Sequence, residues 1–112
     1  MEIIAKRRIW AIRPETSAVF PIDVQIGRPY ELSTDEWACP VQLIGLHRLR
    51  DIHGGDSFQA LMLAQNLART LLSGFVEDGG ELIDSPGGNP INVDSMFTTG
   101  VCLPLKAPGN SP

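Results

Sequence analysis

Residues 54–74 read GGDSFQALMLAQNLARTLLSG, and this stretch predicts the one long helix of the chain. Asp56 is placed to accept hydrogen bonds from the free N–H groups of the first turn, and Gln59 completes a variant of the capping box. Gly74 predicts the end of the helix, because glycine is favoured just past a helix C-terminus. Apolar residues recur between these ends at helical spacing and form one stripe, namely Leu61, Ala64, Leu67, Ala68 and Leu71.

Two strands are predicted near the N-terminus. Residues 3–12 are rich in β-branched and aromatic residues, and Pro14 ends this run. Residues 18–26 alternate with a period of two, which is typical of a half-buried strand. One face of this strand holds the apolar residues and the other holds the polar ones, the apolar set being Phe20, Ile22, Val24 and Ile26.

Further strands complete the expected sheet. Gly27 and Pro29 predict that residues 27–35 connect two strands without extending either. Residues 36–46 alternate again, and short strands are expected at residues 49–52 and 81–83. The sequence therefore predicts an α+β fold, in which an antiparallel sheet of three to five strands packs on one main helix.

The composition changes at Ser85. Residues 1–84 are expected to form a single α+β domain, and residues 85–112, rich in Pro, Gly, Asn and Ser, an irregular C-terminal extension. Because a disordered linker carries few large apolar side chains, this extension is expected to dock on the sheet or on a neighbouring subunit. Its apolar residues are Ile91, Val93, Met96, Phe97, Val101, Leu103 and Leu105.

One helix covers only one face of a sheet, so the opposite face is expected to be bare. Its expected members are Ile9 or Trp10, Val19, Ala38 and Ile44. We expect the extension, from the same chain or exchanged between two chains, to lie across this face. A symmetric homodimer is the expected assembly.

Composition narrows the class of function. The chain has 112 residues and a formal net charge of −4, which argues against nonspecific nucleic-acid binding, because that binding needs clustered Lys and Arg. The sequence has neither the run of about 18 apolar residues that a membrane span requires nor the zones of a signal peptide, so a cytoplasmic location is expected. Two cysteines, Cys39 and Cys102, are too few for a disulfide framework.

Three segments carry a resemblance to a known family. They are Trp37-x-Cys39-Pro40-Val41, Gly45-Leu46 and the run from Gly55 to Ala64. In these segments the chain resembles a family of small uncharacterised bacterial proteins, a domain of unknown function, over roughly residues 3 to 83. The resemblance implies the order strand, strand, strand, helix, and it suggests an origin in a mobile gene cassette. It implies no activity.

The pattern H-x3-D-x-H is formed by His47, Asp51 and His53. Imidazole and carboxylate groups are common metal ligands, but this spacing matches no established site, so we interpret them as surface residues beside a connection. No metal and no cofactor is expected. Cys39 shares its predicted face with apolar residues, which favours a small buried hydrophobe over a nucleophile.

Basic residues surround Trp10 in the first strand. Cations interleaved with an aromatic ring can hold single-stranded nucleic acid, but neutralisation by acidic residues suits the overall charge better. The cations are Lys6, Arg7, Arg8 and Arg13, and the expected acidic partners, inside the fold or across a dimer, are Glu77, Asp78, Glu81 and Asp84.

No catalytic motif is found in the chain, so the sequence does not support an enzyme. The preferred function is a non-enzymatic binding or assembly module that self-associates through an apolar surface including Trp10 and Phe97. The alternative is a small-molecule binding protein, or an enzyme without a sequence motif. Its pocket would lie between sheet and tail or at the dimer cleft, near His47, Asp51 and His53.

Overall fold

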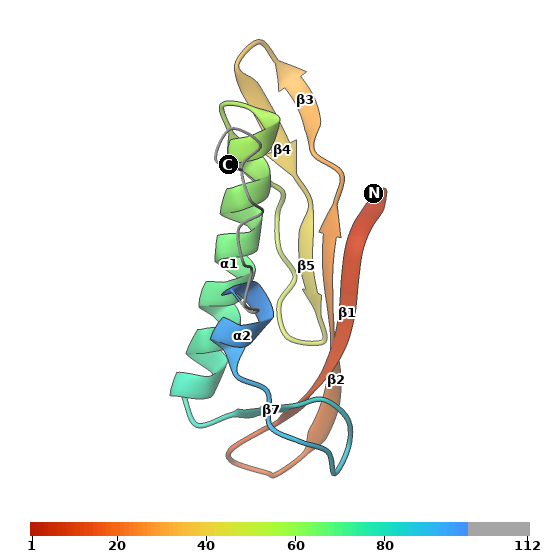
Figure 1. The fold of residues 1–112 in the computed structure, drawn as a ribbon, viewed down its shortest axis with the longest axis vertical. Helices are drawn as coiled ribbons and strands as arrows, with labels where there is room; N and C mark the ends of the chain where they lie inside the picture. The colour runs from red at the N-terminus through yellow and green to blue at the C-terminus, as the bar shows by residue number, and fades with distance from the viewer. Residues whose placement is uncertain (99–112) are drawn as a thin grey trace, which may run out of the picture.

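The computed structural model describes residues 1–98 and confirms the α+β class. Two antiparallel sheets and one main helix make up most of this part of the chain (Figure 1). The elements are β1 (Ile3–Ile12), β2 (Val19–Gly27), β3 (Tyr30–Ser33), β4 (Glu36–Cys39), β5 (Val41–Ile44), β6 (Ile52–Gly54), α1 (Ser57–Glu77), β7 (Glu81–Ile83) and α2 (Val93–Thr98).

The four-stranded sheet has the order β5-β2-β1-β7, and the three-stranded sheet has the order β3-β4-β6. They meet where β2 leads into β3 through Pro29 and β4 leads into β5 through Pro40. Proline has no N–H to donate to a strand ladder, so the pairing breaks there, although the Pro40 carbonyl still accepts from the Gly27 N–H at 2.8 Å. The prediction that residues 27–35 only connect two strands is therefore wrong, because part of this segment forms β3. The single strand predicted at residues 36–46 is two strands, β4 and β5.

The start of α1 is as predicted, and its end is not. The Asp56 carboxylate accepts from the Gln59 N–H at 2.7 Å, and the Gln59 amide oxygen accepts from the Gly55 N–H at 2.6 Å. The helix continues through Gly74 to Glu77, and Gly79, at φ 101°, takes the left-handed conformation after the C-cap. The extra turn holds Phe75, whose ring packs edge-on against Phe20 at 6.1 Å between centroids.

The core lies between α1 and the helix-facing side of the sheets. The apolar face of β2 is confirmed, because Ile22, Val24 and Ile26 are buried and Phe20 packs against them. Small side chains bring α1 close to the sheets, since the helix buries Ala60, Ala64, Ala68 and Leu72. A Cβ added at Gly54 would lie only 2.6 Å from the backbone nitrogen of Ala60.

The chain after β7 returns to the helix side. Ile91, Val93, Met96 and Phe97 pack against the core cluster, and Arg69 of α1 forms an ion pair with Asp94 of α2 at 2.7 Å. Figure 1 shows α2 beside α1. The expectation that the extension crosses the opposite face is therefore wrong for residues 91–97, whereas Val101, Leu103 and Leu105 lie outside the described residues. A domain boundary at Ser85 stays a prediction.

Ile9 and Ala38 are not part of the bare face. Both side chains are fully buried, and Ile9 belongs to the core cluster. In β1 the buried residues Ile9 and Ala11 alternate with the half-buried Trp10, so Trp10 points away from α1. None of the helices within residues 1–98 is long and apolar enough to cross a membrane.

Candidate functional site

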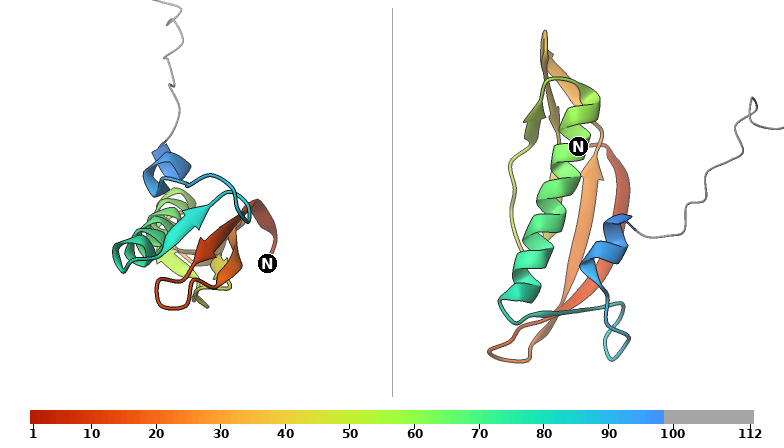
Figure 2. Two further views of the ribbon diagram at one scale, coloured as in Figure 1. Left: turned by 90° about the horizontal axis from the view of Figure 1, so that it is seen from below. Right: turned by 60° about the vertical axis from the view of Figure 1, so that its left-hand side comes forward.

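The outer face of the four-stranded sheet, on the side away from α1, carries an apolar patch. Strand register places Trp10 opposite Pro21 and Ile12 opposite Val19, and Ile44 of β5 lies opposite Asp23 of β2. Val19 and Ile44 are each 48% exposed, and Trp10 and Ile12 are half-buried. No helix in the described part of the chain covers this side (Figure 2). We call these five residues the outer patch.

A polar rim borders the outer patch along the same strands. The Arg8 guanidinium donates to both Asp23 carboxylate oxygens, at 2.7 and 3.0 Å. These bonds hold the pKa of Asp23 below its usual value. Lys6 and Gln25 are register partners further along the sheet. The outer face is therefore apolar toward the β1–β2 turn and charged toward Lys6, and Ile44 lies in the row of the Arg8–Asp23 pair, where the two regions meet.

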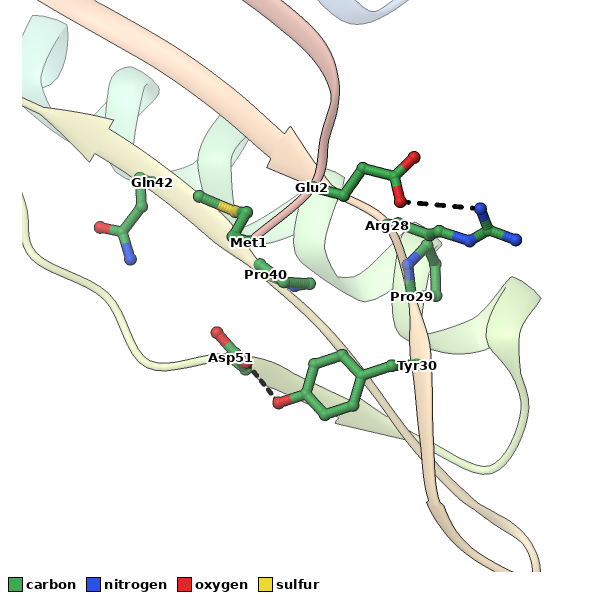
Figure 3. A pocket seen from close by; sticks show the side chains of 8 residues that line it. All are labelled: Met1, Glu2, Arg28, Pro29, Tyr30, Pro40, Gln42 and Asp51. Carbon is green, nitrogen blue, oxygen red and sulfur yellow. Dashed lines mark hydrogen bonds and ion pairs between the residues drawn. The ribbon is translucent and has the colours of Figure 1, made fainter.

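A cleft of about 490 Å³ lies where the N-terminus meets the junction of the two sheets (Figure 3). Tyr30 forms one wall, and its hydroxyl donates to the Asp51 carboxylate at 2.5 Å, which raises the pKa of Tyr30. Gln42 contributes a second wall and is fixed by two hydrogen bonds to the backbone of Leu49. The remaining lining residues are Met1, Glu2, Arg28, Pro29 and Pro40.

The structure does not bring His47, Asp51 and His53 into one site. His47 lies in the turn after β5 and lines a different hollow from Asp51. The His53 side chain lies on β6, where its Nδ1 is 3.1 Å from a Glu36 carboxylate oxygen. Within residues 1–98, no group of three or more His, Cys, Asp and Glu side chains is arranged to hold a metal ion.

Trp10 and Phe97 lie on opposite sides of the sheet. Trp10 belongs to the outer patch, whereas Phe97 packs beside Met96 on the side of α1. Phe97 also lines a hollow of about 140 Å³ between the sheet and α2, together with Ala5 and Val24. One continuous surface therefore does not contain both aromatic residues.

Cys39 is a buried free thiol, as its predicted face suggested. Its side chain is fully buried, and its sulfur lies 3.4 Å from the Gly27 carbonyl oxygen. Burial raises the pKa of the Cys39 thiol, which disfavours the reactive thiolate. The sequence-based interpretation of Cys39 as a small hydrophobe is confirmed.

The cations of β1 have different partners from those expected. Arg8 pairs with Asp23, and the Arg13 guanidinium lies 4.4 Å above the ring of Phe20. Among residues 1–98, no ion pair joins these cations to Glu77, Asp78, Glu81 or Asp84. The prediction that those four acids neutralise the strand inside the fold is therefore wrong for the described part of the chain, whereas neutralisation across a dimer stays a prediction.

The family of the chain follows from its sequence match. A family model described as a domain of unknown function, DUF6968, matches residues 6–88. The chain belongs to the DUF6968 family. The match takes in most of β1 and all of β2 to β7 and α1, and it includes the three motif segments. No curated protein and no solved structure matches the chain.

Sequence reasoning missed residues of both sites, including most of the lining of the cleft. Ile12 and Pro21 complete the outer patch, and Tyr30 forms the wall of the cleft. Alternation could have found the first two, because strand residues next to the buried Ala11 of β1 and Ile22 of β2 must face the other side. Tyr30 could not be found this way, since its strand was predicted to be a connection.

Proposed function

We propose that this DUF6968 member is a non-enzymatic binding and assembly module, and that it self-associates through the outer patch. The observation that carries the proposal is the exposed apolar end of a sheet whose other face is already occupied by α1 and α2. A sheet with one bare apolar face is stabilised when a second layer covers it. Two copies packed patch to patch give a symmetric homodimer with the helices outside.

The chemistry of the patch fits a second copy of the same chain. A two-fold axis through the patch would bring Trp10 and Val19 of one protomer against the same surface of its partner. Covering the exposed half of Val19 or Ile44 contributes about 1 kcal/mol per side chain. The Arg8–Asp23 pair lies at the rim, where polar groups stay hydrated and set the orientation of the partner.

The test is the solution mass of the full chain by light scattering over a range of concentrations. We expect a dimer, and we expect Val19→Glu and Ile44→Glu to convert it to a monomer with an unchanged circular dichroism spectrum. Leu63→Glu is the matched control, because Leu63 is 41% exposed but lies on α1. A monomer at all concentrations, or a dimer that only Leu63→Glu disrupts, would contradict the proposal.

Small-molecule binding at the cleft is the second candidate. The cleft has the size of a ligand site, whereas the hollow of about 140 Å³ between sheet and α2 is too small for a ligand of ordinary size. Asp51 offers a carboxylate beside the aromatic wall of Tyr30. A thermal-shift screen tests it: a specific ligand raises the melting temperature of the wild type but not of Asp51→Asn.

We also propose an origin for the protein and a location in the cell. The resemblance of the three motif segments to small bacterial proteins supports a bacterial, cassette-borne origin. The composition, together with a buried free Cys39, supports a cytoplasmic location. Fractionation of cells that express the tagged full chain tests the location.

A further inference from the structure

One edge of β1 has no strand beside it over much of its length. β1 pairs with β2 from Ile3 to Ile12, but β7 covers only Trp10 to Ile12 on the other side. In the part of the chain that the structure describes, no backbone pairing is recorded on this edge before Trp10. Unpaired N–H and C=O groups on a strand edge are a template for an added strand.

Two features fix the length of this open edge. The register shift between Ile3 and Ala5 marks a bulge, which interrupts a regular ladder at one end. The start of β7 opposite Trp10 closes the other end. A segment of about five residues could pair with Ala5–Ile9, and we call this stretch the β1 slot.

The charge of the β1 slot selects among possible occupants. Lys6, Arg7 and Arg8 are consecutive and exposed, and no ion pair within residues 1–98 engages Lys6 or Arg7. A second copy paired antiparallel about Lys6 or Arg7 would place cations directly opposite one another, which destabilises a strand pair. An acidic segment gains favourable cross-strand pairs in the same position.

Apolar side chains border one side of the β1 slot. Side chains of successive residues in β1 point to opposite faces, and those of Ala5 and Arg7 point to the helix side. On that side Met96 and Phe97 of α2 line the hollow of about 140 Å³. An apolar side chain opposite Ala5 would enter this hollow. The side chains of Lys6 and Arg8 point to the outer face, so the residues of an added strand that lie opposite them would meet positive charge.

We propose that the β1 slot binds an extended acidic segment of another protein by strand addition. An apolar residue of the segment lies opposite Ala5, and acidic residues lie opposite Lys6 and Arg8. The slot is an edge of the sheet and the outer patch is a face, so this site is separate from the proposed dimer surface. Backbone hydrogen bonds supply affinity, and the alternating side chains supply specificity.

The experiment uses the full chain, labelled for NMR, and an end-blocked ten-residue peptide in which Glu alternates with Val and Thr. We expect the peptide to shift the amides of Ala5–Ile9 and to protect those among them that point to the open edge and not to β2. The same peptide with Lys in place of Glu should bind about tenfold more weakly. Lys6→Glu should reduce this preference, because it replaces one of the two cations that face the acidic residues of the peptide, and Arg7→Glu, on the other side of the strand, is the matched control. The melting temperatures show whether both variants keep the fold.

Any of five outcomes overturns the proposal. Three concern the peptides: both bind equally, neither binds at millimolar concentration, or the shifts fall only on residues away from the β1 slot and from Met96 and Phe97. The fourth is tighter binding of an oligothymidylate at the same residues. The fifth is protection, before any peptide is added, of those amides of Ala5–Ile9 that do not bond to β2. Concentration-dependent protection would identify a second copy, and concentration-independent protection would identify a segment of the same chain.

Discussion

Replacing Gly74 by alanine is expected to stabilise the protein. Gly74 lies inside α1 with an ordinary negative φ, and a Cβ built there meets no atom within 4 Å. Glycine in a helix interior is about 0.8–1.0 kcal/mol less favourable than alanine, mainly because of its entropy in the unfolded chain. The free energy of unfolding should therefore rise by about 0.5–1 kcal/mol, which corresponds to roughly 2–6 °C in melting temperature.

The matched control is Gly79→Ala. Gly79 has φ 101°, and an added Cβ would approach the Pro14 Cβ to 3.2 Å. This variant should lose roughly 1–2 kcal/mol, because a side chain is strained in that conformation. Urea and thermal unfolding at one fixed protein concentration measure both variants. If Gly74→Ala destabilised the protein as much as Gly79→Ala does, α1 would end at Gly74 and the account of its last turn would be wrong.

Three further predictions concern titratable groups. Tyr30 is the single tyrosine of the chain, so absorbance at high pH should show that its pKa lies above the usual value of about 10. Asp51→Asn should lower this pKa, and an unchanged titration would contradict the Tyr30–Asp51 bond. The folded pKa of Asp23 is depressed, so its pair with Arg8 stabilises the fold above about pH 4 and is lost on acidification. Asp23→Asn should therefore reduce the loss of unfolding free energy between about pH 5 and pH 2, and an equal loss in both proteins would argue against the pair. Cys39 should react with a thiol reagent only after unfolding, and rapid labelling of Cys39 in the native protein, located by mass spectrometry, would disprove its burial.

The sequence predicts a feature correctly where the contacts that stabilise it join residues close together in the chain. The start of α1 depends on Asp56 and Gln59, which bond to backbone within four residues, and both contacts occur. The faces of β2 follow from its period of two, because a strand alternates wherever its partners lie. These features make up the helix and the helix-facing core.

Other features depend on residues that are distant in sequence. β3 forms in a segment with turn residues because Tyr30 pairs with Ala38 of β4. Gly74 and Gly79 both suit a helix end, and the turn between them is helical where Phe75 meets Phe20. Local propensity differs too little between such alternatives to choose one.

Spacing along single elements was enough to predict the α+β class, the start of the helix, the buried face of β2 and the burial of Cys39. Three other features come from contacts between distant elements: α2 shares the side of α1, His47 and Asp51 line different hollows, and part of β1 keeps an open edge. Alternation shows which side chains share a face of a strand. Which faces and which backbone edges are covered depends on long-range packing, and that choice has no local signal.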